Sequence, residues 1–207
     1  MIYEIRTYTT KPGQVAEYER RFSEALEVRS KYSQMYGMWH TEIGPLNQIV
    51  HIWSYDSLQQ RAEIRATAAR DDSGKWPPNT SELLVAQETD IVVPIKGMHH
   101  HSGAQELGGV YELRMYTYPA GALAAVADVF AAAYTERHAT YPVGGIWTSD
   151  LGQLNRLYQL FPYKSWEHRE QVRGELREKR IWPPHSEARP VAQLVRHMLP
   201  AAFSPLR

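Results

Sequence analysis

The sequence repeats itself, and this internal repeat constrains the fold more than any other feature. When Tyr3 is aligned with Tyr111, YEIRTYT lies on YELRMYT, and the segment WHTEIGPLN beginning at Trp39 lies on WTSDLGQLN beginning at Trp147. A match that keeps one register over so much of the chain indicates two homologous units. Further pairs in the same alignment, continued past a short deletion in the second copy, are Gly13 with Gly121, Phe22 with Phe130, Arg29 with Arg137, and Trp76 with Trp182.

The repeat divides the chain into two domains and a connector. We place the first unit at 1–95 and the second at 110–207, with a linker at 96–109. The linker sequence, KGMHHHSGAQELGG, is rich in Gly, Ser and His and has no hydrophobic periodicity, which is typical of a connecting segment. Its three consecutive histidines could suggest a metal site, but we expect them to lie in a solvated connector.

Each unit shows the same order of strand and helix patterns. Strand-like segments alternate with segments whose apolar residues recur at helical spacing, and Gly37 is expected to end the first helix. Asp56 or Ser57 is suited to cap the second helix. In the first unit the predicted elements are strand 2–9, helix 14–36, strands 38–43 and 48–55, helix 56–70 and strand 82–93.

This βαββαβ order predicts a ferredoxin-like unit of the α+β class. Its antiparallel sheet would carry both helices on one side and leave an apolar face on the other. A sheet cannot expose such a face to water, so two units are expected to bury their faces against each other. Because both units are in one chain, we predict that they close into an intramolecular α/β barrel.

Composition narrows the classes of function. The chain has 23 basic and 23 acidic residues, so no net field attracts nucleic acid or an anionic membrane surface. With no cysteine, disulfides, thiolate metal sites and a cysteine nucleophile are excluded. No apolar run is long enough to span a membrane, and the first residues begin a strand without the layout of a signal peptide. We therefore expect a cytoplasmic protein.

Three segments of the first unit resemble the NIPSNAP family, which belongs to the dimeric α/β-barrel group. They are YEIRTYTTKPG, GMWHTEIGPLNQIVHIWSYDSLQQR and the strand ending in AQETDIVVP, and the second unit carries looser versions of all three. The resemblance covers nearly all of both units and implies the barrel fold. It implies no single activity, because related barrels include cofactor-independent monooxygenases, decarboxylases, cyclases and small-molecule binding proteins.

The differences between the two copies indicate where a specialised site lies. His40 and His51 of the first unit correspond to Thr148 and Gln159 of the second. If Pro45-Leu46 forms a two-residue turn, His40 lies directly opposite His51 on the neighbouring strand, and the two imidazoles are within side-chain reach. The first unit is therefore the expected location of the site.

The same sheet face would also carry Glu42 beside the two histidines. A histidine can transfer protons near neutral pH, and an adjacent carboxylate can orient it. We predict His51 or His40 as general base, Glu42 as orienting group or acid, and Arg6 or Tyr8 as oxyanion stabiliser. Two histidines and one carboxylate could instead bind a divalent metal, or both histidines could be ordinary strand residues.

Five further residues are predicted to bind substrate. Arg6 offers a rigid fork of donors to an anion or carbonyl, although an ion pair with Glu4 is the structural alternative. Aromatic side chains on the strands and in the Trp-Pro-Pro loop could line a pocket for an aromatic ligand or simply pack in the core. The predicted set is Arg6, Tyr8, Trp53, Tyr55 and Trp76.

Three functions remain open from the sequence. The first is a protein that binds a small organic molecule, aromatic or polyketide-like, as a cofactor-independent monooxygenase, lyase or isomerase. The second is a non-catalytic binding or scaffold protein, and the third is a metal-dependent enzyme. No nucleotide-binding or common hydrolase motif is present, so no cofactor is expected. The expected partner is a small-molecule ligand, with a homodimer of the tandem chain left open.

Overall fold

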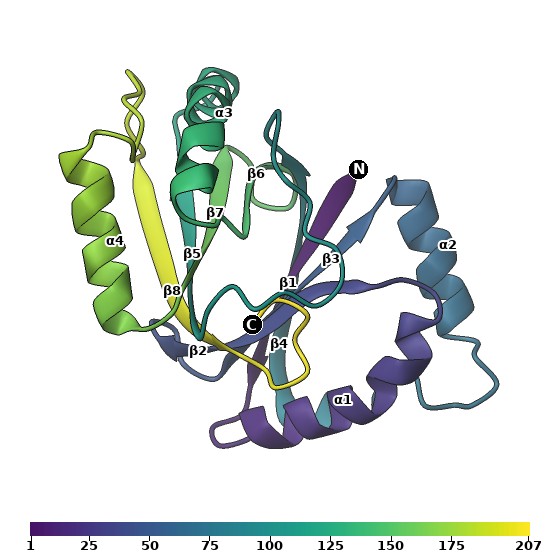
Figure 1. The fold of residues 1–207 in the computed structure, drawn as a ribbon. Coiled ribbons are helices and arrows are strands. Elements are labelled where there is room, and N and C mark those ends of the chain that lie inside the picture. The colour runs from purple at the N-terminus through teal and green to yellow at the C-terminus, as the bar shows by residue number, and fades with distance from the viewer.

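The computed structural model describes residues 1–207 as eight strands in one closed barrel with four helices outside it (Figure 1). Both copies run in the order predicted from the repeat. The first unit consists of β1 (Ile2–Thr10), α1 (Val15–Ser30), β2 (Met35–Ile43), β3 (Gln48–Tyr55), α2 (Leu58–Ala68), the 3-10 turn η1 (Ser81–Leu83) and β4 (Leu84–Pro94). The second consists of β5 (Val110–Thr117), α3 (Leu123–Thr140), β6 (Gly145–Leu151), β7 (Arg156–Tyr163), α4 (Trp166–Glu178) and β8 (Ala192–Pro200).

The barrel closes through two seams between the units. Its strand order is β1-β3-β2-β8-β5-β7-β6-β4, and every neighbouring pair is antiparallel. At one seam Trp39 of β2 pairs with Pro200 of β8, and at the other Pro94 of β4 pairs with Trp147 of β6. The predicted intramolecular barrel is therefore confirmed, and neither unit keeps an open sheet edge.

The barrel interior is the shared core of the two units. Side chains alternate along each strand, so Tyr3 and Ile5 of β1 point inward, whereas Arg6 lies on the face toward the helices. The interior cluster draws on both copies, and Tyr36 donates a 2.6 Å hydrogen bond to the carbonyl of Gly144 in the other unit. The apolar face of each unit's sheet is thus buried against that of the other unit, as predicted.

The helices form an outer layer over the barrel. Figure 1 shows α1 and α2 on one half and α3 and α4 on the other. The inward face of α1 buries Tyr18, Phe22 and Ala25 against β1 and β3. Ser57 caps α2 by accepting a hydrogen bond from the backbone of Gln60, which selects one of the two predicted capping residues. None of the helices is both long and apolar enough to cross a bilayer.

The predicted end of the first helix was wrong. Helix α1 ends at Ser30, and Gly37 lies inside β2 rather than after the helix. The glycine is needed there because the ring of Trp39 lies against its backbone: a Cβ at position 37 would stand 2.1 Å from the indole. The glycine signal was real, but it marks a close packing contact in a strand rather than a helix terminus.

The predicted pairing of His40 with His51 was also wrong. Strands β2 and β3 are joined by a loop from Gly44 to Asn47, both with positive φ, and not by a two-residue turn. The longer loop shifts the pairing, so that His51 lies opposite Met38 and His40 lies opposite Ile49. The shift preserves which face each residue occupies, but it separates the two imidazoles along the strands.

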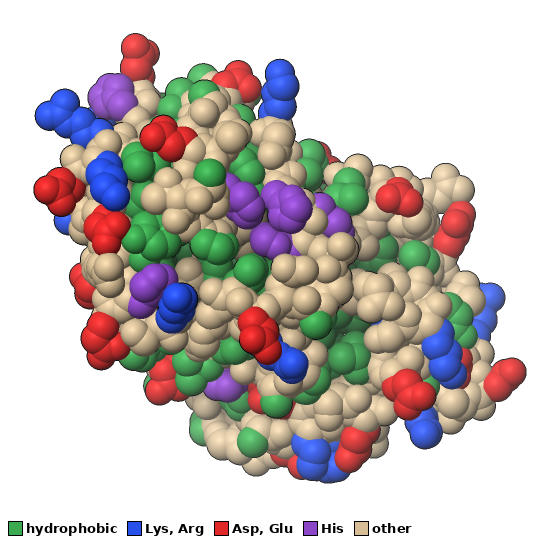
Figure 2. Space-filling model, in the orientation of Figure 1, with side chains coloured by type: hydrophobic (Ala, Val, Ile, Leu, Met, Phe, Trp, Pro, Cys, Tyr) green, Lys and Arg blue, Asp and Glu red, His purple; other side chains and the backbone are tan.

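Much of the linker is exposed, His99 included, as expected of a connector, but two of its histidines pack against the barrel. His101 is buried and bonds through Nε2 to the carbonyl of Val143, and Nδ1 of His100 lies 2.6 Å from the hydroxyl of Tyr3. Histidines gather in one patch on the face seen in Figure 2. The imidazole can both donate and accept, so these side chains satisfy groups at the end of the barrel that water would otherwise bind.

Candidate functional site

A cavity of about 310 Å³ lies in the first unit between the outer face of the sheet and the helical layer. Strands β1 and β3 form its floor, α1 and α2 its walls, and the segment between α2 and β4 its rim. Aromatic rings and arginines predominate among the side chains around it. They include Arg6, Tyr8, Tyr18, Phe22, Arg29, His51, Trp53, Tyr55, Arg65, Trp76, Pro77, Pro78, Thr80 and Gln87.

The structure brings together all five residues predicted to bind substrate. Arg6 and Tyr8 come from β1, Trp53 and Tyr55 from β3, and Trp76 from the rim. Alternation along the two strands places these strand residues on the helix-facing side of the sheet. Of the predicted catalytic residues, only His51 also lines this cavity.

His40 and Glu42 lie outside the cavity. Nδ1 of His40 donates a 2.8 Å hydrogen bond to the carboxylate of Glu19 on α1, and this bond raises the pKa of the imidazole. Glu42 is exposed near the end of β2. The three predicted catalytic side chains therefore do not meet, and no group of three or more His, Asp or Glu side chains is placed to hold a metal ion. The metal-dependent alternative lacks its ligand set.

His51 is held as a neutral imidazole with a fixed proton position. Its side chain is buried, and Nδ1 accepts a 2.8 Å hydrogen bond from Nε1 of Trp53. Burial, reinforced by the nearby charge of Arg6, lowers the pKa of His51 to about 3. The neutral ring must therefore carry its hydrogen on Nε2, which has no partner in the protein. This geometry favours a hydrogen-bond donor over the general base that the sequence suggested.

A buried carboxylate organises the arginines of the sheet. Glu4 contacts Arg6 at 2.9 Å, Arg61 at 2.5 Å and Arg65 at 3.7 Å. Burial opposes its ionisation, but the hydrogen bond from Arg61 and the three positive charges hold the pKa of Glu4 at about 2. The predicted structural alternative for Arg6 is thus real, but one negative charge is shared among three guanidinium groups. The surroundings of the cavity keep a positive excess.

Arg29 lines the cavity but is not among the residues that the sequence predicted for the site. It is 2% exposed, and its guanidinium donates to Ser33 Oγ and Tyr55 Oη while lying 4.4 Å from the ring centre of Trp53. No carboxylate lies within ion-pair distance of it. Burial lowers the pKa of this group, against the opposing effects of Tyr55 and Glu4. Two features of the sequence indicate that Arg29 is buried: it falls within the apolar stripe of its helix, and it recurs as Arg137 in the second unit.

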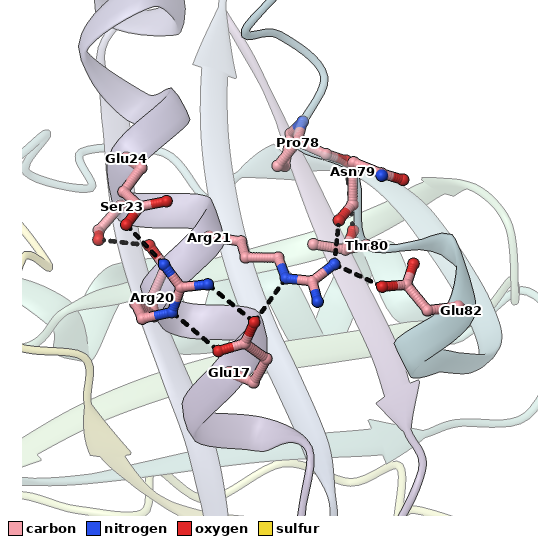
Figure 3. A network of polar contacts seen from close by, with 9 residues as sticks. All are labelled: Glu17, Arg20, Arg21, Ser23, Glu24, Pro78, Asn79, Thr80 and Glu82. Carbon is pink, nitrogen blue, oxygen red and sulfur yellow. Dashed lines mark hydrogen bonds and ion pairs between the residues drawn. The ribbon is translucent and has the colours of Figure 1, made fainter.

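The rim of the cavity is tied to α1 by polar contacts (Figure 3). Arg21 on α1 donates to the carbonyl of Asn79 at 2.7 Å and to the carboxylate of Glu82, and its Nε donates to Glu17 at 2.7 Å. These bonds connect the segment that follows Trp76 to α1.

The equivalent space in the second unit is nearly closed, with a volume of about 30 Å³. Leu176 and Arg177 occupy the positions that correspond to Ala68 and Ala69 on α2, and the larger side chains fill the space. At this position between sheet and helices, the two units therefore share an architecture, but the cavity of the first is about ten times larger than that of the second.

Comparison with known proteins identifies relatives along the whole chain. The NIPSNAP family model matches residues 3–97 and 111–205. NipSnap homolog 3B from Homo sapiens is 30% identical over 99% of this chain and 85% of its own length. A solved NIPSNAP domain protein from Burkholderia xenovorans is 30% identical, covering 47% of this chain and 97% of that one, with a TM-score of 0.44.

A second kind of solved structure matches the complete barrel. A putative monooxygenase from Lactobacillus acidophilus covers 97% of this chain and 93% of its own length, with a TM-score of 0.67 and 12% identity. At that identity the likeness is one of fold. The two family matches, one over each unit, and the full-length relatives show that the chain belongs to the NIPSNAP family, with the family's domain present twice in tandem.

Proposed function

We propose that the first unit binds a small organic anion, with a carboxylate or similar group on an aromatic or apolar body. The observation that carries the proposal is Arg29, a buried guanidinium without a carboxylate partner at the wall of an aromatic cavity. Burying an uncompensated charge is costly, and a bound anion would relieve that cost. Arginine is well suited to this role because its planar fork matches a carboxylate.

The rest of the cavity fits the same ligand. Its volume of about 310 Å³ falls within the size of small-molecule sites, which span roughly 300–1,000 Å³. Phe22, Trp53 and Trp76 offer ring faces and edges to an apolar body. The unpartnered Nε2–H of His51 supplies a neutral donor for an oxygen of the ligand.

Binding is better supported than proton abstraction. Nδ1 of His51 is occupied by Trp53, and Glu4 is held in ion pairs with arginines. Tyr8 accepts a 2.6 Å hydrogen bond from Arg6, and burial raises the pKa of its hydroxyl. No free base therefore lines the cavity at neutral pH, which any catalytic mechanism by proton transfer would need.

A cofactor-independent enzyme is the second candidate function. One observation favours it: His51 Nε2–H and the guanidinium groups of Arg6 and Arg29 would stabilise an oxyanion or enolate that the ligand itself forms. Mass spectrometry of ligands recovered after long incubation separates the two functions. An unchanged ligand supports binding alone, and conversion that is lost in His51→Gln supports the enzyme.

The proposal is tested with benzoate and phenylacetate by isothermal titration calorimetry, with benzamide as the uncharged counterpart. We expect saturable binding of the carboxylates and at least tenfold weaker binding of the amide. Arg29→Gln should abolish binding, whereas Arg137→Gln, the same change in the unit without a cavity, should leave it unchanged.

A third variant tests the site independently of whether Arg29→Gln folds. Ala69→Arg introduces the residue of the second unit at the exposed edge of the cavity and leaves Arg29 in place. We expect this variant to fold normally and to lose ligand. Equal affinity in the wild type, Ala69→Arg and Arg29→Gln would contradict the site.

A further inference from the structure

The small niche of the second unit is surrounded by arginines. It lies between the outer face of β5 and β7 and helix α4, and Phe161, Tyr163 and Trp182 form its apolar sides. The niche has about 30 Å³, a tenth of the volume of the first-unit cavity, and so favours a compact ligand over an aromatic one. Its four cationic side chains are Arg114, Arg137, Arg173 and Arg177.

The protein neutralises these charges only in part. Glu112 forms ion pairs with two of them, Arg114 at 2.8 Å and Arg173 at 3.3 Å. The same carboxylate also pairs with Arg169, which lies outside the niche, at 2.8 Å. Arg177 forms no ion pair in the structure. One negative charge thus faces four lining guanidinium groups, which is a larger positive excess than in the first unit.

Arg137 is the buried member of this set. It is 1% exposed, its Nη1 donates to the carbonyl of Tyr141, and its Cζ lies 4.9 Å from the ring centre of Phe161. Its Nε has no hydrogen-bond partner. Burial lowers the pKa of Arg137 to about 10, so the group stays charged at neutral pH without a counter-ion. A buried, charged donor that lacks a partner indicates a missing acceptor.

The two copies differ in charge as well as in size at this position. A collapsed pocket could be filled by apolar side chains alone, as Leu176 does at the position of Ala68. At the next position, however, Ala69 is matched by Arg177, which adds a charge where the space becomes too small for an organic ligand. The change reduces size and increases positive charge together.

We propose that the second unit holds a small oxyanion, of the phosphate or sulfate class, between Arg137, Arg173 and Arg177. Two oxygens of the anion would enter the niche, where Arg137 and Arg173 can donate to them. Arg177 would close over the anion from the exposed end of α4. The site is separate from the cavity of the first unit, and the two would bind different chemistry: an organic anion in one and a compact oxyanion in the other.

Inorganic phosphate is the probe, titrated calorimetrically at constant ionic strength with chloride as the balancing anion. We expect one saturable site per chain in the wild type. Arg177→Ala, which installs the small residue of the first unit at an exposed position, should weaken binding at least tenfold. Arg189→Ala removes the same charge from an exposed residue outside the niche and should leave the affinity unchanged.

Two further experiments define the site. Arg29→Gln should keep phosphate binding, which separates this niche from the first cavity and from the function proposed for it. Glycerol 3-phosphate distinguishes a free ion from a terminal phosphoryl group: competition with phosphate means that the niche accepts the group on a larger molecule, and no competition means that it takes the free ion. The proposal is overturned if phosphate shows no saturable binding, or if Arg177→Ala and Arg189→Ala bind it equally well.

Discussion

The indole of Trp53 donates its hydrogen bond to Nδ1 of His51, two residues earlier on the same strand, at 2.8 Å. Because indole can only donate, the acceptor nitrogen must be unprotonated, and the neutral ring carries its hydrogen on Nε2. The pair therefore converts a residue that commonly accepts protons into a fixed donor at the cavity wall. It also makes the folded state resist protonation of His51.

The first prediction concerns acid stability. His51 has a pKa of about 3 in the folded state against 6.5 when unfolded. Above the unfolded value both states are neutral and the full stability is present. As pH falls from 6.5 toward 3, only the unfolded state takes the proton, so the free energy of unfolding drops by roughly 1.4 kcal/mol per pH unit. Urea unfolding at pH 7 and pH 5 measures the change.

His51→Gln is the matched control, since glutamine is the natural residue at the corresponding position 159. The variant keeps every other titrating group, so its loss of stability between pH 7 and pH 5 should be smaller by about 2 kcal/mol. The same pH dependence in both proteins would mean that His51 is protonated readily in the folded state.

The second prediction concerns the glycine that the sequence placed at a helix end. Gly37→Ala would put a Cβ 2.1 Å from the buried ring of Trp39, so the indole or the strand must shift. Overpacking of this kind costs about 1–3 kcal/mol. Gly174→Ala is the contrasting change, because a Cβ in this helix meets no atom within 4 Å and should stabilise α4 by about 0.5–1 kcal/mol. Denaturant unfolding of both variants tests the opposite signs.

The third prediction concerns the contact between the units. Tyr36→Phe removes the hydrogen bond to Gly144 and leaves a buried carbonyl without its donor. The expected loss is about 1–3 kcal/mol. Tyr32→Phe removes a partly exposed hydroxyl that bonds to Asp71, and water can replace it there, so stability should change by less than about 0.5 kcal/mol. A Tyr36→Phe variant as stable as Tyr32→Phe would show that the buried bond contributes nothing net.

The fold was largely predictable because the repeat and the amphipathic pattern impose it. Two sheets with one apolar face each must cover those faces, and the seams at Trp39 and Trp147 are the result. Local signals also held where a single residue determines the geometry: Ser57, one of two predicted capping residues, caps its helix. Asn47 and Asn155 adopt the left-handed conformation that asparagine tolerates.

The site was less predictable because it depends on register and on neighbours distant in sequence. The loop between β2 and β3 is longer than a two-residue turn, and both Gly44 and Asn47 adopt positive φ in it. The composition of this segment does not distinguish a two-residue turn from a longer loop. Arg29 gains its meaning only when folding places it against Tyr55 and Trp53, with no carboxylate nearby. The repeat alignment contained Ala69 and Arg177, but only the structure shows that both border the same space.

The last prediction concerns the rim of the first cavity. Arg21 connects α1 to the carbonyl of Asn79 and to Glu82, whereas the side chain of its neighbour Arg20 bonds only within α1, to Glu17 and Glu24 (Figure 3). Arg21→Ala should therefore free the rim while leaving the barrel intact. Both arginines are surface ion-pair residues, so each substitution should cost less than about 1 kcal/mol of global stability.

Hydrogen exchange separates the two variants. In Arg21→Ala, the amides of Leu83 and Leu84, which lie just after the rim, should exchange faster than in the wild type, because local opening no longer breaks the bonds to α1. In Arg20→Ala their exchange should be unchanged. The amides of β1 serve as the internal reference in both proteins, because this strand is paired on both sides within the barrel. If the rim exchanges equally in the two variants, other contacts hold it, and Trp76 is positioned by packing against Phe22 and Trp53 alone.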